Sequence, residues 1–259
     1  MRAPQVGLEG TILLQDLKVA ALFLTRFPVQ IDGQVSMRDL AAAVYAFPLM
    51  GAAVGLLGGL GFVVAGWLGL PSLAAALLAL LSLILATGAL HEDGLADTAD
   101  ALGAGSDRER ALTIMSDSRI GSFGAIALIF SLTARLMALA PMWDPKVVMA
   151  VLVGAGMTSR ALLPVVMLLQ PSAKATGLAA EAGRPDAVRV MLASFVAIGA
   201  TVLLLPFQVA VPALIATALV GLSVAAWLGR RFGGCTGDTL GAVQQVAEIT
   251  FLFSVVARQ

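Results

Sequence analysis

The chain has 259 residues, of which 59% are hydrophobic and only 12% are charged, and its mean hydropathy is +0.95. An ordinary soluble domain carries about a quarter charged residues, so this chain cannot cover its apolar surface in water, and lipid must be the solvent for much of it. The formal net charge of zero provides no signal for nucleic acid, and the single cysteine, Cys235, excludes an internal disulfide framework. We therefore expect an all-α polytopic membrane bundle in which residues 1–259 form one domain.

The first predicted element is an N-terminal helix over residues 13–27. Asp16, Lys18 and Arg26 interrupt its apolar run, which favours a helix lying in the membrane interface, with a re-entrant span as the alternative. Seven later segments are long and apolar enough to cross a bilayer, which takes roughly 20 residues. These predicted spans are residues 46–68, 72–90, 120–140, 147–169, 190–207, 209–228 and 240–256.

Two features of the predicted spans indicate how they pack. The turn at 69–71 and the prolines Pro206 and Pro212 separate successive spans by only a few residues, which predicts antiparallel neighbours. In the first span, small residues recur at near-helical spacing, which permits close approach of another helix. These residues are Gly51, Gly55, Gly58 and Gly59.

The distribution of basic residues predicts the orientation. If the N-terminus is inside and the spans alternate, the outside segments hold only Lys146 and Arg258. The inside segments then hold Arg2, Lys18, Arg26, Arg38, Arg108, Arg110, Arg119, Lys174, Arg184, Arg189, Arg230 and Arg231. This asymmetry predicts a multi-pass protein of the cell (inner) membrane with a cytoplasmic N-terminus and an external C-terminus. The polar loops 92–119, 170–189 and 229–239 then share the cytoplasmic side, where we expect the active site.

The segment 91–124 is unusually acidic. Asp93, Asp97 and Asp100 follow i, i+4, i+7 spacing, so on a helix they share one face and repel one another unless a cation lies between them. Such hard oxygen ligands suit Mg²⁺ or Mn²⁺. The alternative is an ordinary solvated helix face, but the cluster directly continues an apolar span, which favours a metal site. Asp107 and Glu109 alternate with arginines and indicate a charged helix start.

Four further charged residues lie near or within spans. Asp117 and Arg119 precede the third span, where they fit either a helix cap or a fourth metal ligand with a phosphate clamp. Arg160 falls inside the fourth span and needs a charged partner, a polar cavity or a substrate phosphate. For Arg135, in the outer half of the third span, snorkelling or a structural ion pair is the favoured interpretation.

The stretch 230–249 combines a glycine-rich loop with a polar start of the last span. Glycines at 233, 234 and 237 free the backbone to approach an anion beside Thr236 and Asp238, at the N-terminus of a helix. Gln244, Gln245 and Glu248 carry this polarity into the span, which helix packing alone does not require. A structural pairing of Glu248 with Arg135 or Arg160 is the open alternative.

These motifs resemble the cobalamin synthase family, also called adenosylcobinamide-GDP ribazoletransferase. The similarity rests on LHEDGLADTADALGAG, IMSDSRIGSFG and GGCTGDTLGAVQQVAE, with LFLTRFPV and FPLMGAAVGLL earlier in the chain. It covers essentially the whole chain in order. The chain departs at Glu92, where a leucine is common, and at Ala101, where a glycine is common.

The resemblance implies the last step of nucleotide-loop assembly in cobalamin biosynthesis. Such transferases are membrane-bound and Mg²⁺-dependent, and they join α-ribazole or its 5′-phosphate to adenosylcobinamide-GDP, releasing GMP. It implies catalytic and metal-binding roles for Asp93, Asp97, Asp100 and Asp117, with Glu92 as a further metal ligand. It implies substrate contacts by Arg119, Arg160, Thr236, Asp238, Gln244 and Glu248.

A secondary transporter is the main competing class, with the acids carrying protons or cations. Transporter sites usually lie near the bilayer midplane and accompany internal repeats, whereas these acids gather in one stretch beside the membrane. The expected partners are thus the two substrates and membrane lipid, without nucleic acid. The sequence leaves open whether the chain forms a homo-oligomer.

Overall fold

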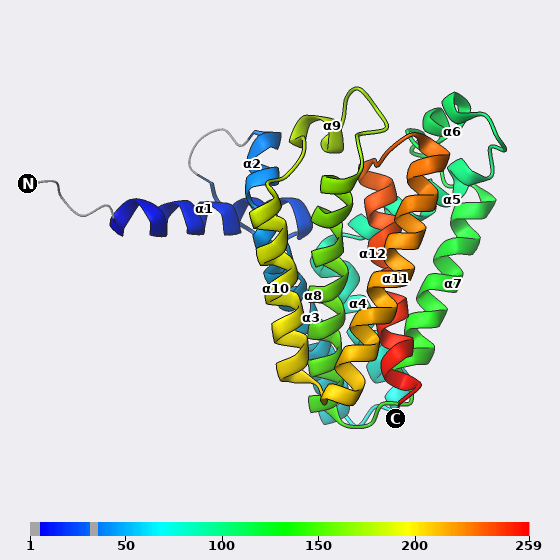
Figure 1. Cartoon of the computed structure of the whole chain (residues 1–259). Coiled ribbons are helices and arrows are strands. Elements are labelled where there is room, and N and C mark those ends of the chain that lie inside the picture. The colour runs from blue at the N-terminus through cyan, green and yellow to red at the C-terminus, as the bar shows by residue number, and fades with distance from the viewer. Residues whose placement is uncertain (1–5, 32–35, 259) are drawn as a thin grey trace, which may run out of the picture.

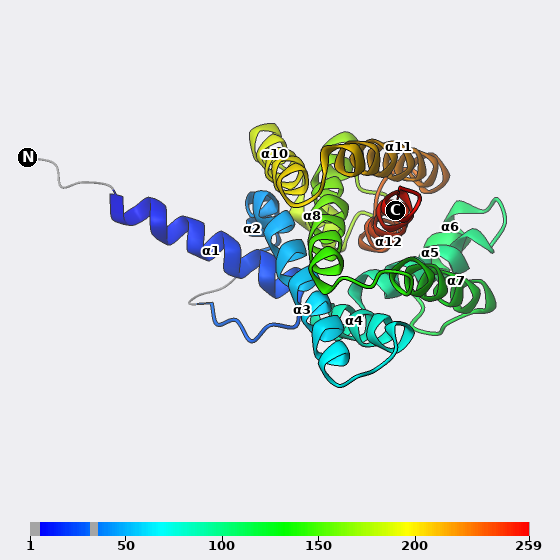
Figure 2. The ribbon, with the colours of Figure 1, turned by 90° about the horizontal axis from the view of Figure 1, so that it is seen from below.

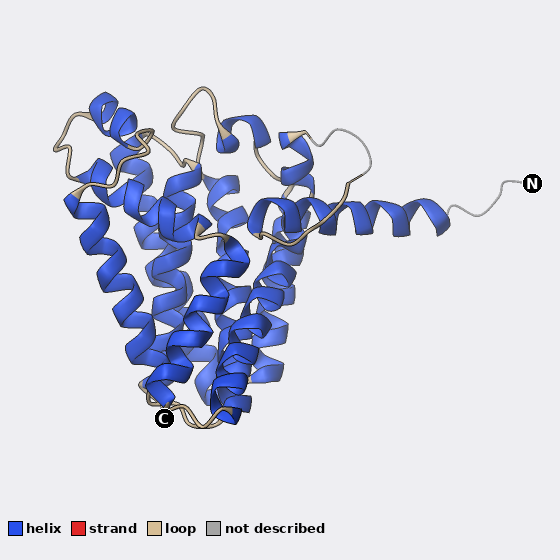
Figure 3. Cartoon of the chain, turned by 180° about the vertical axis from the view of Figure 1, so that it is seen from behind, coloured by secondary structure: helices blue, strands red, loops and turns tan. Residues whose placement is uncertain are grey.

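A computed structural model describes residues 6–31 and 36–258, and Arg2 lies outside this part of the chain. The described residues form helices joined by loops, which confirms the all-α prediction (Figure 1, Figure 3). The elements are α1 (Val6–Leu24), α2 (Met37–Ala42), the 3₁₀ turn η1 (Val44–Ala46), α3 (Phe47–Trp67), α4 (Ser72–Thr87), α5 (Leu90–Leu102), α6 (Arg108–Ile114), α7 (Ser122–Leu139), α8 (Pro145–Leu169), α9 (Leu178–Ala182), α10 (Ala187–Leu204), α11 (Phe207–Phe232) and α12 (Gly237–Val256).

All seven predicted spans coincide with helices of the bundle. Within the described residues, six are long and apolar enough to cross a membrane by themselves: η1 with α3, α7, α8, α10, α11 and α12. The seventh, α4, is shorter than predicted because the chain bends by 87° between α4 and α5. Helix α5 therefore lies across the bundle, outside the six spans and beside α6 (Figure 1).

The loops with the polar motifs meet at one end of the bundle. Helices α5, α6 and α9 and the loop before α12 lie at this end, whereas the C-terminus lies at the opposite end (Figure 1). We call the end with these loops the polar end. The predicted convergence of the three polar loops is confirmed.

Helix α1 extends sideways from the bundle, nearly perpendicular to the spans (Figure 1, Figure 2). Its C-terminal part is anchored by the buried side chains of Val19, Ala20 and Leu24. Leu13 and Leu14, farther out, are about half exposed, at 50% and 55%. An apolar helix that leaves the bundle sideways fits the predicted interfacial position, where lipid would cover those leucines.

The helix α8 forms the centre of the bundle, with α3, α10, α11 and α12 around it (Figure 2). Its contact with α3 is a contact of backbones. A Cβ atom added to Gly51 would overlap the carbonyl oxygen of Gly156, and one added to Gly156 would overlap the carbonyl oxygen of Gly51. The predicted role of the first-span glycines in close packing therefore holds, with α8 as the helix approached.

The bend before α5 arises from two consecutive left-handed residues. Gly88 has φ 65° and Ala89 has φ 59°. Gly88 adopts this conformation without strain, but an alanine in the left-handed region costs roughly 1–2 kcal/mol. The surrounding packing must therefore hold Ala89 in place, and the bend directs the acidic segment across α12.

We expect Gly51→Ala to lower the stability of the bundle by about 1–3 kcal/mol, because the backbones of α3 and α8 must separate. Thermal unfolding of the detergent-solubilised protein measures this loss. Gly66→Ala on the same helix is the matched control, since nothing lies within 4 Å of the added methyl group. Equal unfolding midpoints for both variants would contradict the close packing described above.

Candidate active site

Helix α5 crosses the start of α12 at the polar end. The two backbones touch, because a Cβ added to Gly94 would lie 2.8 Å from the carbonyl oxygen of Asp238 and 3.2 Å from Cα of Gly241. This close crossing brings the aspartates of α5 beside Asp238, the second residue of α12. Two predicted sites that are far apart in the sequence thus form one.

Three carboxylates, from Asp93, Asp97 and Asp238, face one another across this crossing. Burial, followed by the charges of Asp93, Asp238 and Asp100, raises the pKa of Asp97 from 3.8 to about 6. Asp93 is exposed and Asp97 is half-buried, so the cluster is accessible from outside the bundle. We call Asp93, Asp97 and Asp238 the carboxylate face. It is a region of mutual repulsion that a cation would relieve.

Lys174 is the basic residue nearest to the carboxylate face. Its Nζ lies 3.9 Å from Oδ2 of Asp238 and donates a hydrogen bond of 2.9 Å to Oγ of Ser116. Three carboxylates and one ammonium group leave an excess of negative charge. A sequence pattern could not identify Lys174, because only the folding of its loop over α12 brings it to the site.

The loops around the site are tied together by their backbones. The amide of Ala173 donates to the carbonyl of Cys235 at 2.8 Å, and the amide of Cys235 donates to the carbonyl of Pro171 at 2.9 Å. Arg108, at the start of α6, donates to the carbonyl oxygens of Phe232 (2.6 Å) and Ala173 (2.8 Å). These bonds fix the loop that carries Lys174 relative to the start of α12.

Asp100 lies on the same helix but bonds to α7. Its carboxylate accepts hydrogen bonds from the amides of Gly121 (2.7 Å) and Gly124 (2.8 Å), at the N-terminus of α7. Amides at a helix start stabilise a negative charge, so Asp100 joins α5 to α7. Each of its oxygens keeps a second lone pair, so the predicted part in metal binding stays a prediction.

Asp117 and Arg119 pair with each other on the exposed loop before α7. Nη2 of Arg119 lies 2.7 Å from Oδ2 of Asp117, and the side chain of Arg119 is 87% exposed. The hydrogen bonds from Arg119 hold the pKa of the Asp117 carboxyl below its usual value. Such an exposed arginine is free to reorient toward a bound anion, and its predicted clamp role remains a prediction.

A buried ion network lies beneath the carboxylate face. Nη2 of Arg135 lies 3.0 Å from Oε1 of Glu92, and its Nη1 lies 3.4 Å from Oε1 of Glu248. Nη1 of Arg160 lies 3.7 Å from Oε2 of Glu248. The four side chains, at most 9% exposed, come from α5, α7, α8 and α12, and their formal charges cancel. We call Glu92, Arg135, Arg160 and Glu248 the charge quartet.

Two glutamines complete the hydrogen bonding around the charge quartet. Gln244 donates to Glu248 at 2.7 Å and to Ser159 at 3.0 Å. Gln245 donates to Glu92 at 3.3 Å and to Gln244 at 3.0 Å, and it accepts a bond from Ser131 at 2.9 Å. Glu248 thus makes the ion pairs with Arg135 and Arg160 that the sequence analysis gave as the structural alternative. Glu92 likewise pairs inside the bundle, away from the carboxylate face. It does not join the aspartates, although the sequence analysis expected it to be a further metal ligand.

Thr236 caps α12. Its hydroxyl accepts a bond of 3.1 Å from the amide of Thr239, whose own hydroxyl accepts from the amide of Thr236 at 2.8 Å. The side chain is buried, so these bonds account for it locally. Substrate contacts by Thr236, Gln244 and Glu248 stay predictions.

The carboxylate face is open and shallow. Among the described residues, no three His, Cys, Asp or Glu side chains converge closely enough to hold a metal ion by themselves. Magnesium rarely needs three such side chains, because it commonly binds one or two carboxylates and takes its other ligands from water and substrate phosphates. The donor set of the face suits such a shared ion.

The fold and this site define a polytopic membrane protein with a polar site at one end of the bundle. A sequence profile described as cobalamin-5-phosphate synthase matches residues 16–256, and the chain belongs to this family of enzymes. Family membership decides for an enzyme and against the transporter. No solved structure matches the chain.

Full-length relatives agree with this assignment. A protein of Bradyrhizobium diazoefficiens named adenosylcobinamide-GDP ribazoletransferase is 45% identical over 95% of each chain. Proteins of the same name from Mesorhizobium japonicum and Azorhizobium caulinodans are 42% and 44% identical, over 97% and 94% of this chain and 96% of their own length.

We expect Glu92→Gln and Arg135→Met each to destabilise the bundle by about 3–5 kcal/mol, because each leaves a buried charge unbalanced. The double variant restores neutrality, since Glu248 and Arg160 still pair, and should recover most of the loss. Thermal unfolding of the three detergent-solubilised variants measures the coupling. Additive losses in the double variant would refute the charge balance as the stabilising factor.

Proposed function

We propose that the chain catalyses the Mg²⁺-dependent transfer of the adenosylcobinamide phosphate group from adenosylcobinamide-GDP to α-ribazole or its 5′-phosphate. A ribose hydroxyl oxygen forms a bond to the cobinamide-linked phosphorus, and the bond from that phosphorus to the GMP oxygen breaks. The products are adenosylcobalamin, or its 5′-phosphate, and GMP. The family and the names of the relatives support this reaction.

The observation that carries the proposal is the carboxylate face itself. Asp93 and Asp97 on α5 meet Asp238 on α12, with their charges in excess over the nearby Lys174. A diphosphate is also anionic and cannot approach three carboxylates without cations between them. Mg²⁺ held by one or two of these carboxylates and by substrate phosphates would neutralise the diphosphate and the departing GMP.

The chain's own side chains would orient the substrates and move the proton. Asp97 is the proposed acceptor of the ribose hydroxyl proton, because its carboxylate is half-buried on the carboxylate face, beside Asp93 and Asp238. Lys174 is placed to contact a phosphate oxygen, and the exposed Arg119 can turn toward one. Asp100 and the charge quartet, which includes Arg160, position α5 from below.

The proposed location is the cell (inner) membrane, with the polar end in the cytoplasm. Eight of the basic residues assigned inside lie at that end, in its loops, in α6 or at the polar ends of α10 and α11: Arg108, Arg110, Arg119, Lys174, Arg184, Arg189, Arg230 and Arg231. The opposite end carries Lys146 and Arg258. The positive-inside rule supports this orientation, which brings nucleotide substrates to the site.

We expect Asp97→Asn to lower GMP release by at least about 10³-fold while the protein still inserts and folds, because the variant loses a metal ligand and the proton acceptor. Purified protein in detergent, supplied with both substrates and Mg²⁺, provides the assay. Glu109→Gln, at an exposed acid of α6, is the control and should keep normal activity. Full activity of Asp97→Asn, or turnover in excess EDTA, would refute the proposed metal site.

Lys174 and Arg119 can be compared in the same assay. Lys174→Met should raise KM for adenosylcobinamide-GDP by about tenfold, because a charge-assisted phosphate contact is lost. Arg119→Met should have a smaller effect, since that side chain starts 87% exposed and paired with Asp117. The reverse order of effects would assign the phosphate contact to Arg119.

A further inference from the structure

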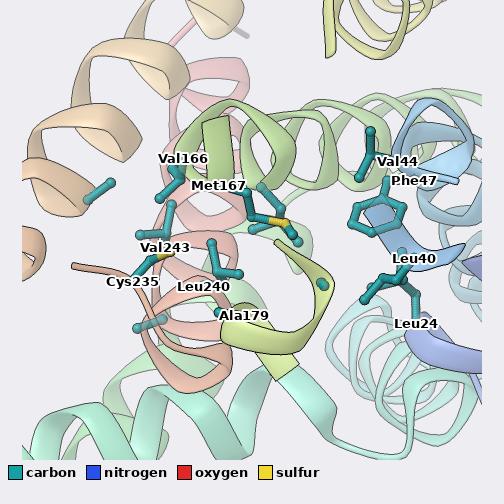
Figure 4. Packing of buried hydrophobic residues seen from close by; sticks show 14 of the residues in the cluster. Leu24, Leu40, Val44, Phe47, Val166, Met167, Ala179, Cys235, Leu240 and Val243 are labelled. Atoms are coloured by element: carbon teal, nitrogen blue, oxygen red, sulfur yellow. The ribbon is translucent and has the colours of Figure 1, made fainter. Parts of the chain in front are cut away.

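A pocket of about 210 Å³ opens beside the carboxylate face. It lies between the end of α1, α2, the start of α3, the upper part of α8 and the starts of α5 and α12. Met167 and Leu240 lie on one side, and Leu24, Leu40 and Phe47 lie on the other (Figure 4). Leu163 completes the apolar wall. The polar lining consists of His91, Asp93 and Asp238. We call this space the apolar pocket.

We propose that the apolar pocket binds the benzimidazole base of the ribazole substrate. This proposal rests on the proposed function, and it gives one of the two substrates a binding site. The base is a flat bicyclic ring with a largely apolar surface and one imine nitrogen that can accept a hydrogen bond. A pocket with an apolar wall and a few polar groups at one edge is complementary to such a ring.

Size and polarity distinguish this base from the other parts of the substrates. Pockets for drug-sized ligands span about 300–1,000 Å³, so a space of about 210 Å³ excludes the corrin macrocycle and admits one bicyclic ring. Guanine has a similar size but carries several donors and acceptors, which would lose their hydrogen bonds to water against leucine, methionine and phenylalanine. The wall therefore favours the benzimidazole over the guanine.

His91 belongs to the polar lining of the pocket, and its ring carries a nitrogen without a hydrogen-bond partner among the described residues. Its side chain is 3% exposed, and within the described residues its Nε2 has no hydrogen-bond partner. Buried polar atoms are nearly always paired, so an unpaired ring nitrogen at a pocket calls for a ligand atom or a water molecule. A neutral imidazole that donates from Nε2 would match the imine nitrogen of the base.

The position of the pocket also suits the reaction. Asp93 and Asp238 belong both to the pocket lining and to the carboxylate face. A base held against the apolar wall would therefore place the attached ribose at the aspartates, where the hydroxyl must meet the phosphorus. The pocket serves as the binding site of the acceptor, and the diphosphate approaches from the open side of the face.

Leu163→Phe tests this assignment by filling the pocket. KM for α-ribazole should rise at least about tenfold, while KM for adenosylcobinamide-GDP should change less than about twofold. Leu162→Phe is the matched control, because the adjacent leucine of the same helix lies toward Gly221 and outside the pocket. An unchanged KM for α-ribazole, or an equal rise for both substrates, would overturn the proposal.

A binding measurement separates this inference from the proposed function. Free 5,6-dimethylbenzimidazole should bind the purified wild-type protein in equilibrium dialysis and bind at least about tenfold more weakly to Leu163→Phe. If Leu163→Phe does not fold, Met167→Phe replaces it. Specific base binding without GMP release would refute only the proposed function, whereas GMP release without base binding would refute only the assignment of the pocket.

The contribution of His91 is tested with an isosteric substrate. The indole analogue of α-ribazole replaces the imine nitrogen by C–H, and wild-type kcat/KM should favour the benzimidazole. His91→Phe should reduce this preference by about tenfold, and His91→Gln, which keeps a donor, should retain most of it. An equal preference in wild type and His91→Phe would remove His91 from the recognition of the base.

Discussion

The balance of buried charge is the constraint on which the rest of the structure depends. Arg135 and Arg160 lie inside spans, where an unpaired charge is costly, and Glu92 and Glu248 neutralise them. These contacts join α5 and α12 to α7 and α8, so the four helices cannot move independently without separating charges. Glu92 is adjacent to Asp93 on a helix with 3.6 residues per turn, so fixing Glu92 inward sets Asp93 on a different face. The charge quartet thereby orients the carboxylate face.

The bend at Gly88 and Ala89 makes this arrangement possible. A straight continuation of α4 would carry the aspartates along the bundle axis and away from α12, but the 87° bend lays α5 across the start of α12. The glycine crossing at Gly94 and Gly241 then allows backbone contact. The left-handed Ala89 costs free energy, which the charge quartet and the bonds of Asp100 to α7 offset. The strained backbone at Ala89 is thus stabilised by the charge quartet and by the hydrogen bonds of Asp100 to α7.

The sequence predicted the spans, the shared end of the polar loops and the acidic helix face, because hydropathy and helical spacing depend on nearby residues. It could not decide between ion pairing and substrate binding for Arg160 and Glu248. These residues lie far apart in the chain, and only the packing of α8 against α12 shows that they meet. Glu92 and Asp93 illustrate the same limit. They are neighbours in the sequence, but the rotation of α5 about its axis buries Glu92 in the charge quartet and leaves Asp93 on the carboxylate face. The exact end of α4 was missed because an alanine rarely adopts the left-handed conformation.

The charge quartet and the carboxylate face meet different requirements of the site. The charge quartet is neutral, nearly inaccessible and internally bonded, so it contributes rigidity without competing for ligands. The carboxylate face is charged, accessible and incompletely paired, so the cation and the diphosphate of the proposed function would lower its electrostatic energy by binding together. A preorganised frame lets that binding energy act on the substrates without first ordering the protein. The apolar pocket beside the face extends this logic, since an acceptor base held by apolar contacts adds no charge to a site that already carries too much.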